Sequence, residues 1–392
     1  MTFGRPLRAA GAMRRALAIG AALALGASAA DAQEPAAHDY YAWVASEAVD
    51  KLQLVRFGPA GLTIERTHTV GILPTDPDGP HGVAVAPDGN HLFVSTGHGT
   101  PFGSLWKYST RDDRLEGRVE LGLFPATLQV SPDGYLAYVV NFNLHGDMVP
   151  SSVSVVATDE MLEVARIPTC VMPHGSRLNA QGTKHYSACM MDDELVEIDT
   201  RNLAVSRTFL LRKGQEHGMV GAMTTSASAS GAPAHDAGEH GMEPPKPGNV
   251  SCSPTWAQPT PDGRRVFVAC NKASEIAEID AGRWTLTRRI PAGDGVYNLA
   301  VTHDGRLLVA TNKRGQSVSV FDAATGKELK RLPTKRKVVH GVAITGDDRY
   351  AFISVEGIGS EPGTVEVIDL RALATVATVE VGPMASGIDV LP

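Results

Sequence analysis

The sequence predicts an all-β protein, a seven-bladed β-propeller of four-stranded antiparallel blades. Three observations lead to this prediction. A short motif recurs seven times, the segments between its copies alternate apolar and polar residues between turns, and the two ends of the chain complete one another. The composition agrees, because 40 Gly and 25 Pro in 392 residues favour many short elements joined by turns over a helical bundle.

The recurring motif begins with two consecutive positions, and the first of them holds His, Ala, Thr, Tyr or Ser. Alternating apolar residues follow, and the motif ends in a turn of the Pro-Asp-Gly type in most copies. The second positions of the seven copies are Gly82, Thr127, Gly175, Trp256, Asn298, Gly341 and Gly387. Their spacings are 45, 48, 81, 42, 43 and 46 residues. A repeat of ~40–45 residues with four strands is what a propeller blade requires.

Three further β-rich segments follow the motif in the same order. A second strand is predicted at segments such as 92–95 or 265–268, a third at segments such as 317–322, and a fourth at segments such as 327–332. Alternation with a period of two residues, bounded by turn residues, is typical of antiparallel strands joined by tight turns.

The chain ends supply the seventh blade. The last motif copy, 386–392, provides only an innermost strand, whereas residues 40–70 provide three strands without an innermost partner. Joining the C-terminal inner strand to the N-terminal outer strands closes the ring and removes an open sheet edge. We therefore expect one propeller over residues 40–392, preceded by a linker at 33–39.

Two segments fall outside the repeat. Residues 1–32 combine Arg14-Arg15, an apolar run at 16–29 and Ala30-Asp31-Ala32, which predicts a secretory signal peptide. The alternative, an uncleaved membrane anchor, is disfavoured because the run is shorter than the ~20 residues that span a bilayer. The interval of 81 contains an insert at 212–249, rich in Gly, Ala, Ser, Pro, His and Met, which we expect to be a flexible irregular loop.

The charge and the signal peptide restrict location and partners. Without residues 1–32 the net charge is about −10, which disfavours nucleic acid and anionic membranes as partners. We expect a periplasmic or secreted protein without a membrane span after cleavage, whose partner is a small ligand, a peptide or a periplasmic protein.

The second strands carry Tyr138-Val139-Val140-Asn141, Phe267-Val268-Ala269-Cys270-Asn271 and Val309-Ala310-Thr311-Asn312. These segments resemble the YVTN-repeat (YncE-like) β-propeller family of secreted and periplasmic proteins. That group lies within a superfamily that includes the propellers of nitrous oxide reductase, cytochrome d1 and quinoprotein amine dehydrogenases. The resemblance covers nearly the whole mature chain apart from the insert. It implies the propeller fold and leaves the function open between binding proteins and redox enzymes.

Three histidines occupy the first motif position and are each followed by Gly: His81, His174 and His340. At the start of an innermost strand, all three side chains are expected to approach the channel axis from one end. Converging imidazoles predict a copper or zinc site, and the resemblance to nitrous oxide reductase, whose propeller histidines bind copper, favours copper. Alternatively, these residues cap strands or line a wet channel without metal.

The insert supplies a second set of candidate copper ligands: His217, Met219, His235, His240 and Met242. Imidazole and thioether ligands on a flexible segment suit copper, and the segment is placed to cover the channel mouth as a lid. A low-complexity surface loop is the competing interpretation.

The four cysteines predict two matched disulfides within blades. Cys189 and Cys270 both lie seven residues after a turn Gly, and Cys170 and Cys252 both precede an inner strand. The nearly equal separations of 19 and 18 residues favour Cys170 with Cys189 and Cys252 with Cys270, although four cysteines permit three pairings. Thiolate ligation near His174 is the alternative.

Other polar residues fall in loops between second and third strands, on the same rim of the channel: His98, His145, Asn143, Asn271, Asn312, Lys313, Arg314 and Glu356. A basic run at 335–337 adds positive charge near His340. We find no catalytic triad, phosphate loop or haem-attachment motif. The leading hypothesis is therefore a non-catalytic scaffold that binds a ligand, peptide or partner protein across the His-bearing face. A secondary hypothesis is that this face and the insert bind copper. The alternative is an oxidoreductase that holds a metal or quinone-type cofactor at the channel mouth.

Overall fold

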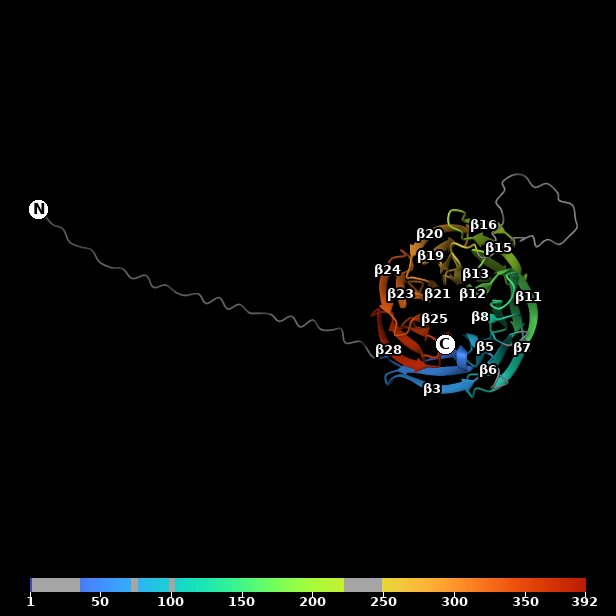
Figure 1. Ribbon diagram of the computed structural model, residues 1–392, viewed down its shortest axis with the longest axis horizontal. Coiled ribbons are helices and arrows are strands. Elements are labelled where there is room, and N and C mark those ends of the chain that lie inside the picture. Colours follow the sequence, from blue (N-terminus) through green and yellow to red (C-terminus); the bar gives the residue numbers. More distant parts are fainter. Residues whose placement is uncertain (2–35, 72–76, 99–102, 222–248) are drawn as a thin grey trace. The chain divides into compact units, whose positions relative to one another are not determined.

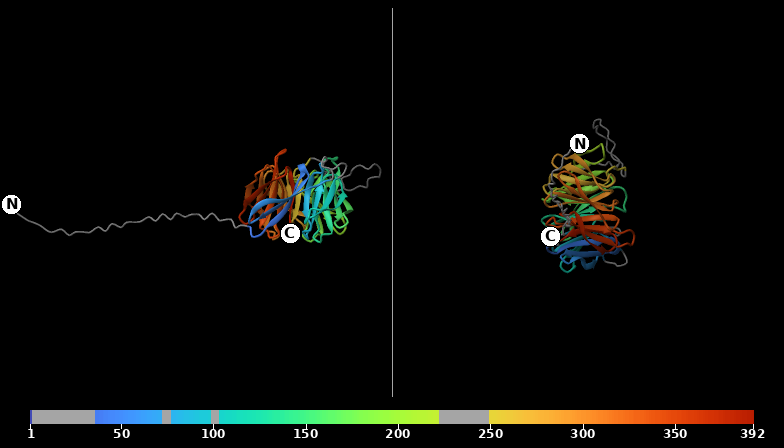
Figure 2. Two further views of the ribbon diagram at one scale, coloured as in Figure 1. Left: turned by 90° about the horizontal axis from the view of Figure 1, so that it is seen from below. Right: turned by 90° about the vertical axis from the view of Figure 1, so that its left-hand side faces the viewer.

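The computed structural model describes residues 36–71, 77–98, 103–221 and 249–392, together with Met1. These residues form seven antiparallel sheets arranged in a ring (Figure 1), which confirms the predicted propeller. Figure 2 shows the same ring from two further directions. In the described ranges the one helical element is a short 3-10 turn, η1 (Glu47–Val49). No helix among these residues is long and apolar enough to cross a membrane.

The strands of each blade are named from the channel outward. Blade I consists of β4 (Pro80–Val85), β5 (His91–Thr96), β6 (Ser104–Ser109) and β7 (Leu115–Glu120). Blade II consists of β8 (Pro125–Val130), β9 (Leu136–Asn141), β10 (Pro150–Ala157) and β11 (Leu162–Val171). Blade III consists of β12 (Pro173–Leu178), β13 (Lys184–Cys189), β14 (Glu194–Asp199), β15 (Ala204–Leu210) and β16 (His217–Val220). Blade IV consists of β17 (Pro254–Pro259), β18 (Arg265–Cys270), β19 (Glu275–Asp280) and β20 (Thr285–Pro291).

The remaining three blades complete the ring. Blade V consists of β21 (Val296–Val301), β22 (Leu307–Asn312), β23 (Ser317–Asp322) and β24 (Glu328–Pro333). Blade VI consists of β25 (Val338–Ile344), β26 (Tyr350–Glu356), β27 (Gly363–Asp369) and β28 (Ala374–Val381). Blade VII consists of β29 (Ala385–Val390), β1 (Tyr40–Ser46), β2 (Lys51–Gly58) and β3 (Gly61–Thr69). The pairing of β29 with β1 is the predicted closure, and it places the C-terminus near the middle of the ring in Figure 1.

One element departs from the sequence prediction. The segment predicted to be irregular from residue 212 contains β16, which pairs with β15 and adds a fifth strand to blade III. An outermost strand leaves the backbone N–H and C=O groups of one edge unpaired, and the short segment that follows β15 in sequence pairs with that edge.

The apolar core lies between neighbouring blades. One cluster, for example, combines Trp256 and Phe267 of blade IV with Leu299, Leu308 and Phe321 of blade V. Because each blade buries its faces against two others, closure of the ring is what covers the first and last sheets.

A bulge interrupts every inner strand at the motif. The register with the neighbouring strand shifts there in all seven blades, as between Pro80 and Val83 in blade I or Pro173 and Ser176 in blade III. A bulge redirects a side chain out of the regular alternation. Here it turns the first motif position toward the channel.

A ring of hydrogen bonds joins the blades at this bulge. In every blade the carbonyl oxygen of the first motif residue accepts a hydrogen bond from a side chain of the preceding blade. The donor and acceptor pairs are Ser386 to His81, Ser95 to Ala126, Thr127 to His174, His174 to Thr255, Thr255 to Tyr297, Thr311 to His340 and Ser354 to Ser386.

Glycine at the second motif position permits this close approach. A Cβ atom on Gly82 would lie 2.1 Å from the carbonyl oxygen of Ala126, and one on Gly387 would lie 2.3 Å from that of His81. These atoms belong to the backbone of the next blade, so they cannot move aside without opening the ring.

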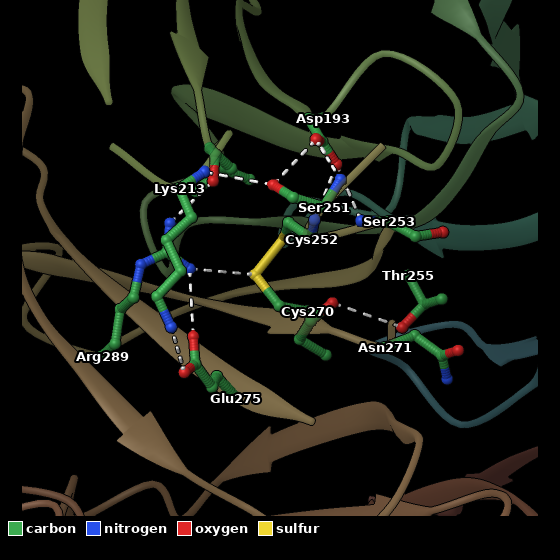
Figure 3. Close-up of a disulfide and its surroundings, with 12 residues drawn as sticks. Asp193, Lys213, Ser251, Cys252, Ser253, Thr255, Cys270, Asn271, Glu275 and Arg289 are labelled. Atoms are coloured by element: carbon green, nitrogen blue, oxygen red, sulfur yellow. Dashed lines mark hydrogen bonds and ion pairs between the residues drawn. A yellow bond between two sulfur atoms is a disulfide. The ribbon is translucent and has the colours of Figure 1, made fainter. Parts of the chain in front are cut away.

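Both predicted disulfides are present, Cys170–Cys189 and Cys252–Cys270. The first differs from the expected bond within one blade, because Cys170 lies on β11 of blade II and Cys189 on β13 of blade III. Chain direction explains the difference, since the outer strand of one blade runs directly into the inner strand of the next. Figure 3 shows the second disulfide, beside the buried Asp193 carboxylate that accepts backbone N–H bonds from Ser251, Cys252 and Ser253.

We expect Gly82→Ala to destabilise the protein by about 1–3 kcal/mol, because the added methyl group overpacks the contact between blades I and II. Gly346→Ala is the matched control, since no atom lies within 4 Å of a Cβ atom there. Guanidinium denaturation of both variants tests this. Equal midpoints for the two variants would contradict the proposed role of the ring.

Candidate binding site at the channel mouth

A cavity of about 700 Å³ opens at one end of the channel. Its wall comes from the two loop classes expected there, those between second and third strands and those that lead into inner strands. The lining residues are Glu47, His81, Phe124, Phe142, Leu144, His174, Met190, Thr255, Asn271, Tyr297, Lys313, Arg314, Lys337, Val338, His340, Glu356 and Met384. The volume is in the range of small-molecule sites.

The structure brings the three motif histidines together at the floor of this cavity. The ring centroid of His81 lies 5.3 Å from that of His340 and 6.2 Å from that of His174. Tyr297 completes the group, with its ring 5.2 Å from His174 and 5.0 Å from His340. All four side chains are buried, and a void of about 30 Å³ lies against His81 and His340.

Hydrogen bonds fix the proton position on His174. Its Nδ1 lies 3.0 Å from the carbonyl oxygen of Thr255, which can only accept, so Nδ1 carries the proton. The Nε2 atom then accepts from the Tyr297 hydroxyl at 2.8 Å. Burial lowers the pKa of His174 to about 3 and that of His340 well below its usual range, so both imidazoles are neutral at physiological pH.

Glu47 connects two imidazoles through one carboxylate. Its Oε2 lies 2.8 Å from His81 Nδ1 and its Oε1 lies 2.6 Å from His98 Nε2. Burial alone would raise the pKa of Glu47, but the charge and hydrogen bonds of the two histidines outweigh burial and lower this pKa to about 2. The remaining ring nitrogen of His81, Nε2, is buried and has no hydrogen-bond partner among the described residues.

A second charged group stands across the cavity. The Lys313 ammonium lies 3.2 Å from Glu356 Oε1 and 4.3 Å from the centroid of the Tyr297 ring. Burial lowers the pKa of Lys313, but Tyr297 and Glu356 raise it by more, so the side chain stays cationic. Arg314 next to it is bound to Asp294 at 3.0 Å and to Asn271 at 2.9 Å.

Apolar residues form the opposite side of the mouth. Phe124 and Phe142 pack together with centroids 5.8 Å apart, and Met190 packs against the same cluster. Phe124 adopts a left-handed backbone conformation, with φ of 49°, which is uncommon for an aromatic residue. Leu144 extends this wall toward solvent.

The arrangement does not form a ready-made metal site. Across the described ranges, no group of three or more His, Cys, Asp or Glu side chains has the geometry to hold a metal ion. A metal at His174 Nε2 would have to replace Tyr297. Copper at His81, His174 and His340 therefore remains a prediction.

The candidate ligands in the insert do not join this floor where they are described. His217 and Met219 lie on β16, the outermost strand of blade III, whereas the floor is formed by inner strands. His235, His240 and Met242 lie outside the described residues.

The weaker sequence candidates divide into lining and structural residues. Asn271, Lys313, Arg314 and Glu356 line the cavity. His98 and His145 pack against Phe124 at 5.3 Å and 5.5 Å. Asn312 instead donates to two serines of β23, and Asn143 donates to the carbonyl oxygen of Asp147.

The sequence analysis does not identify Glu47, Phe124 or Met384. A signal for Glu47 is present in the sequence, since β1 is the second strand of blade VII and the turn after it belongs to the same loop class as His98, His145 and Lys313. Phe124 and Met384 stand directly before inner strands, outside the motif itself.

Comparisons with known proteins show the fold alone. Neither a protein family nor a curated protein matches the sequence. Kuenenia stuttgartiensis hydrazine synthase is similar in structure, with a TM-score of 0.58 at 20% identity over 80% of this chain and 90% of that one. A functionally unknown protein from Desulfotomaculum acetoxidans has a TM-score of 0.63 at 15% identity over 89% and 98%. The similarity to the YVTN-repeat family remains a prediction.

We expect Glu47→Gln to destabilise the protein by about 2–3 kcal/mol, because it removes the carboxylate that pairs with two histidines. The pKa of Glu47 falls from 4.5 to about 2, so its contribution is present above pH 4.5 and is lost toward pH 2. The hydrogen bond to Glu47 raises the pKa of His98 above 6.5, so that contribution is lost as the pH rises beyond this value. The variant is therefore most destabilised between pH 4.5 and 6.5, as measured by urea denaturation.

The control for this measurement is Glu65→Gln, which breaks an exposed ion pair with Arg56 on blade VII. Such pairs contribute little to stability. A destabilisation by Glu47→Gln that does not change with pH would contradict the assignment.

Proposed function

We propose that this protein is a binding propeller that holds a small ligand in the cavity at the channel mouth. One observation supports this most directly: a cavity of about 700 Å³ ends on a floor of four buried imidazole and phenol side chains, of which His81, His174 and Tyr297 are held by hydrogen bonds. A concave site with a few fixed polar groups and apolar walls is typical of ligand binding.

The rigidity of the floor favours binding without rearrangement. His174 and Tyr297 are held by hydrogen bonds, and the backbone beneath them belongs to the ring that joins the blades. A preformed site avoids the entropy cost of ordering side chains when the ligand binds. The two disulfides are typical of proteins that fold in an oxidising compartment, consistent with a ligand outside the cytoplasm.

Leu144→Trp tests this proposal, because Leu144 lines the mouth and is 42% exposed, so a larger side chain can occupy the cavity without disturbing the core. Leu329→Trp on outer strand β24, at 40% exposure, is the control. We expect ligand-observed NMR with a fragment set of anions, cations and neutral compounds to give binders that Leu144→Trp loses and Leu329→Trp retains. The absence of any such binder would overturn the proposal.

Copper at the floor is a second candidate function. It is favoured by the separations of 5.3 and 6.2 Å between imidazole centroids and by the unpartnered Nε2 of His81, whose other nitrogen is held by a carboxylate. A carboxylate on the far nitrogen orients many metal-binding histidines. The low pKa values of His174 and His340 mean that protons do not compete for these nitrogens at neutral pH. An oxidoreductase with a metal or quinone-type cofactor would use the same cavity.

On the copper hypothesis we expect one equivalent of Cu(II) to bind the mature protein with imidazole nitrogen couplings in its electron paramagnetic resonance spectrum. His340→Gln should lose this signal, whereas His303→Gln should keep it, since His303 is exposed and pairs with Asp348. The spectrum of the wild-type protein tests copper binding by imidazole even if His340→Gln does not fold. A spectrum without imidazole couplings would exclude copper at the floor.

A further inference from the structure

We infer that the ligand of the channel-mouth cavity is a small amphipathic carboxylate, with its apolar group against blades II and III and its carboxylate beside Lys337. This inference rests on the proposed function and specifies the chemistry of the same site. Three features carry it: an apolar wall, an unpaired cation opposite that wall, and two carboxylates that are already paired.

The apolar wall comes from consecutive blades. Phe142 and Leu144 follow β9 of blade II, Phe124 precedes β8 of the same blade, and Met190 follows β13 of blade III. Leu144 is exposed, whereas Phe124 and Phe142 are buried at the base of the wall. The apolar surface left open on this wall is therefore that of Leu144 and of the half-buried Met190, and an apolar ligand group that covers it gains the free energy of burial.

The cations line the other side. Lys313 and Arg314 follow β22 of blade V, and Lys337 directly precedes β25 of blade VI. In a ring of seven, blades V and VI lie across the channel from blade II, and Figure 1 shows β25 and β8 on opposite sides of the centre. A ligand that contacts both walls must therefore be polar at one end and apolar at the other.

The charge of the ligand's polar end follows from which charged side chains of the cavity already have partners. Glu47 is shared between His81 and His98, and Glu356 is paired with Lys313. Both lining carboxylates thus have cationic or hydrogen-bonding partners, and a cationic ligand would compete with them.

Lys337 is the exception among the lining cations. Lys313 is paired with Glu356, and Arg314 is paired with Asp294. Lys337 is exposed and makes no hydrogen bond or ion pair with the residues that the structure describes. The free charge in the cavity is therefore positive, and a carboxylate is the ligand group that it attracts.

Four probes separate these features in isothermal titration calorimetry at neutral pH: 3-phenylpropanoate, 3-phenylpropanamide, 3-phenylpropylammonium and acetate. We expect 3-phenylpropanoate to bind about tenfold more tightly than the amide, because its carboxylate accepts a charge-assisted hydrogen bond from Lys337 and the neutral amide does not. The ammonium compound should bind more weakly than the amide, and acetate should not bind measurably.

Matched variants assign the two ends of the probe. Lys337→Met should weaken 3-phenylpropanoate about tenfold and leave the amide unchanged, whereas Lys335→Met, which removes a lysine beside Glu380, should change neither. Leu144→Ala should weaken both compounds equally, and Leu329→Ala should weaken neither.

The outcomes separate this inference from the function it rests on. Equal binding of the acid and the amide, or tighter binding of the ammonium compound, would overturn the carboxylate while leaving a ligand site at the mouth. Binding that Lys337→Met and Lys335→Met reduce equally would overturn the placement at Lys337. Failure of all four probes would overturn the inference, whereas the proposed function fails only if the wider fragment set also gives no binder that Leu144→Trp loses.

Discussion

The closed circuit of hydrogen bonds around the channel is the constraint on which the rest of this structure depends. Seven first motif residues each offer a backbone carbonyl to a side chain of the preceding blade. The acceptor is always backbone, and in three links the donor is the side chain of a first motif residue, His174, Thr255 or Ser386. In the other four links a Ser or Thr at another position donates, so the first position itself is not restricted to one residue type. His, Ala, Thr, Tyr and Ser all occur there, and the same scaffold can therefore carry different chemistry at its centre.

The circuit also determines the electrostatics of the site. Because it holds the inner strands together, the imidazoles of His174 and His340 are buried and neutral. The charged groups of the site lie beside these two imidazoles: Glu47 and Glu356 are paired and Lys337 is not. These charged groups orient a ligand by its ends, since they distinguish an anion from a cation whereas the neutral His174 and His340 do not.

The sequence predicted the features that repeat and the closure of the ring, but it missed contacts that arise only when blades stand side by side. Period and motif predicted seven blades, and the nearly equal cysteine separations of 19 and 18 residues predicted both disulfides. Glu47 was overlooked because its blade is assembled from both chain ends, so no complete motif precedes it in sequence. That Cys170 lies on blade II, and that apolar and basic residues face one another across the mouth, follow from the order of blades around the ring, which a local pattern does not contain.

The backbone conformation at Phe124 places an aromatic side chain at the channel mouth. The residue three positions before the second motif position has positive φ in six blades, and in blades I and V it is Gly79 and Gly295. Glycine adopts this conformation without steric cost, whereas an aromatic residue does not. Strain of this kind persists where surrounding structure requires it, often at functional sites. Blades II, III, IV and VII hold Phe124, Met172, Ser253 and Met384 at this position, so the fold accepts a side chain there. In blade II that side chain is the one that His81, His98 and His145 surround at the channel mouth.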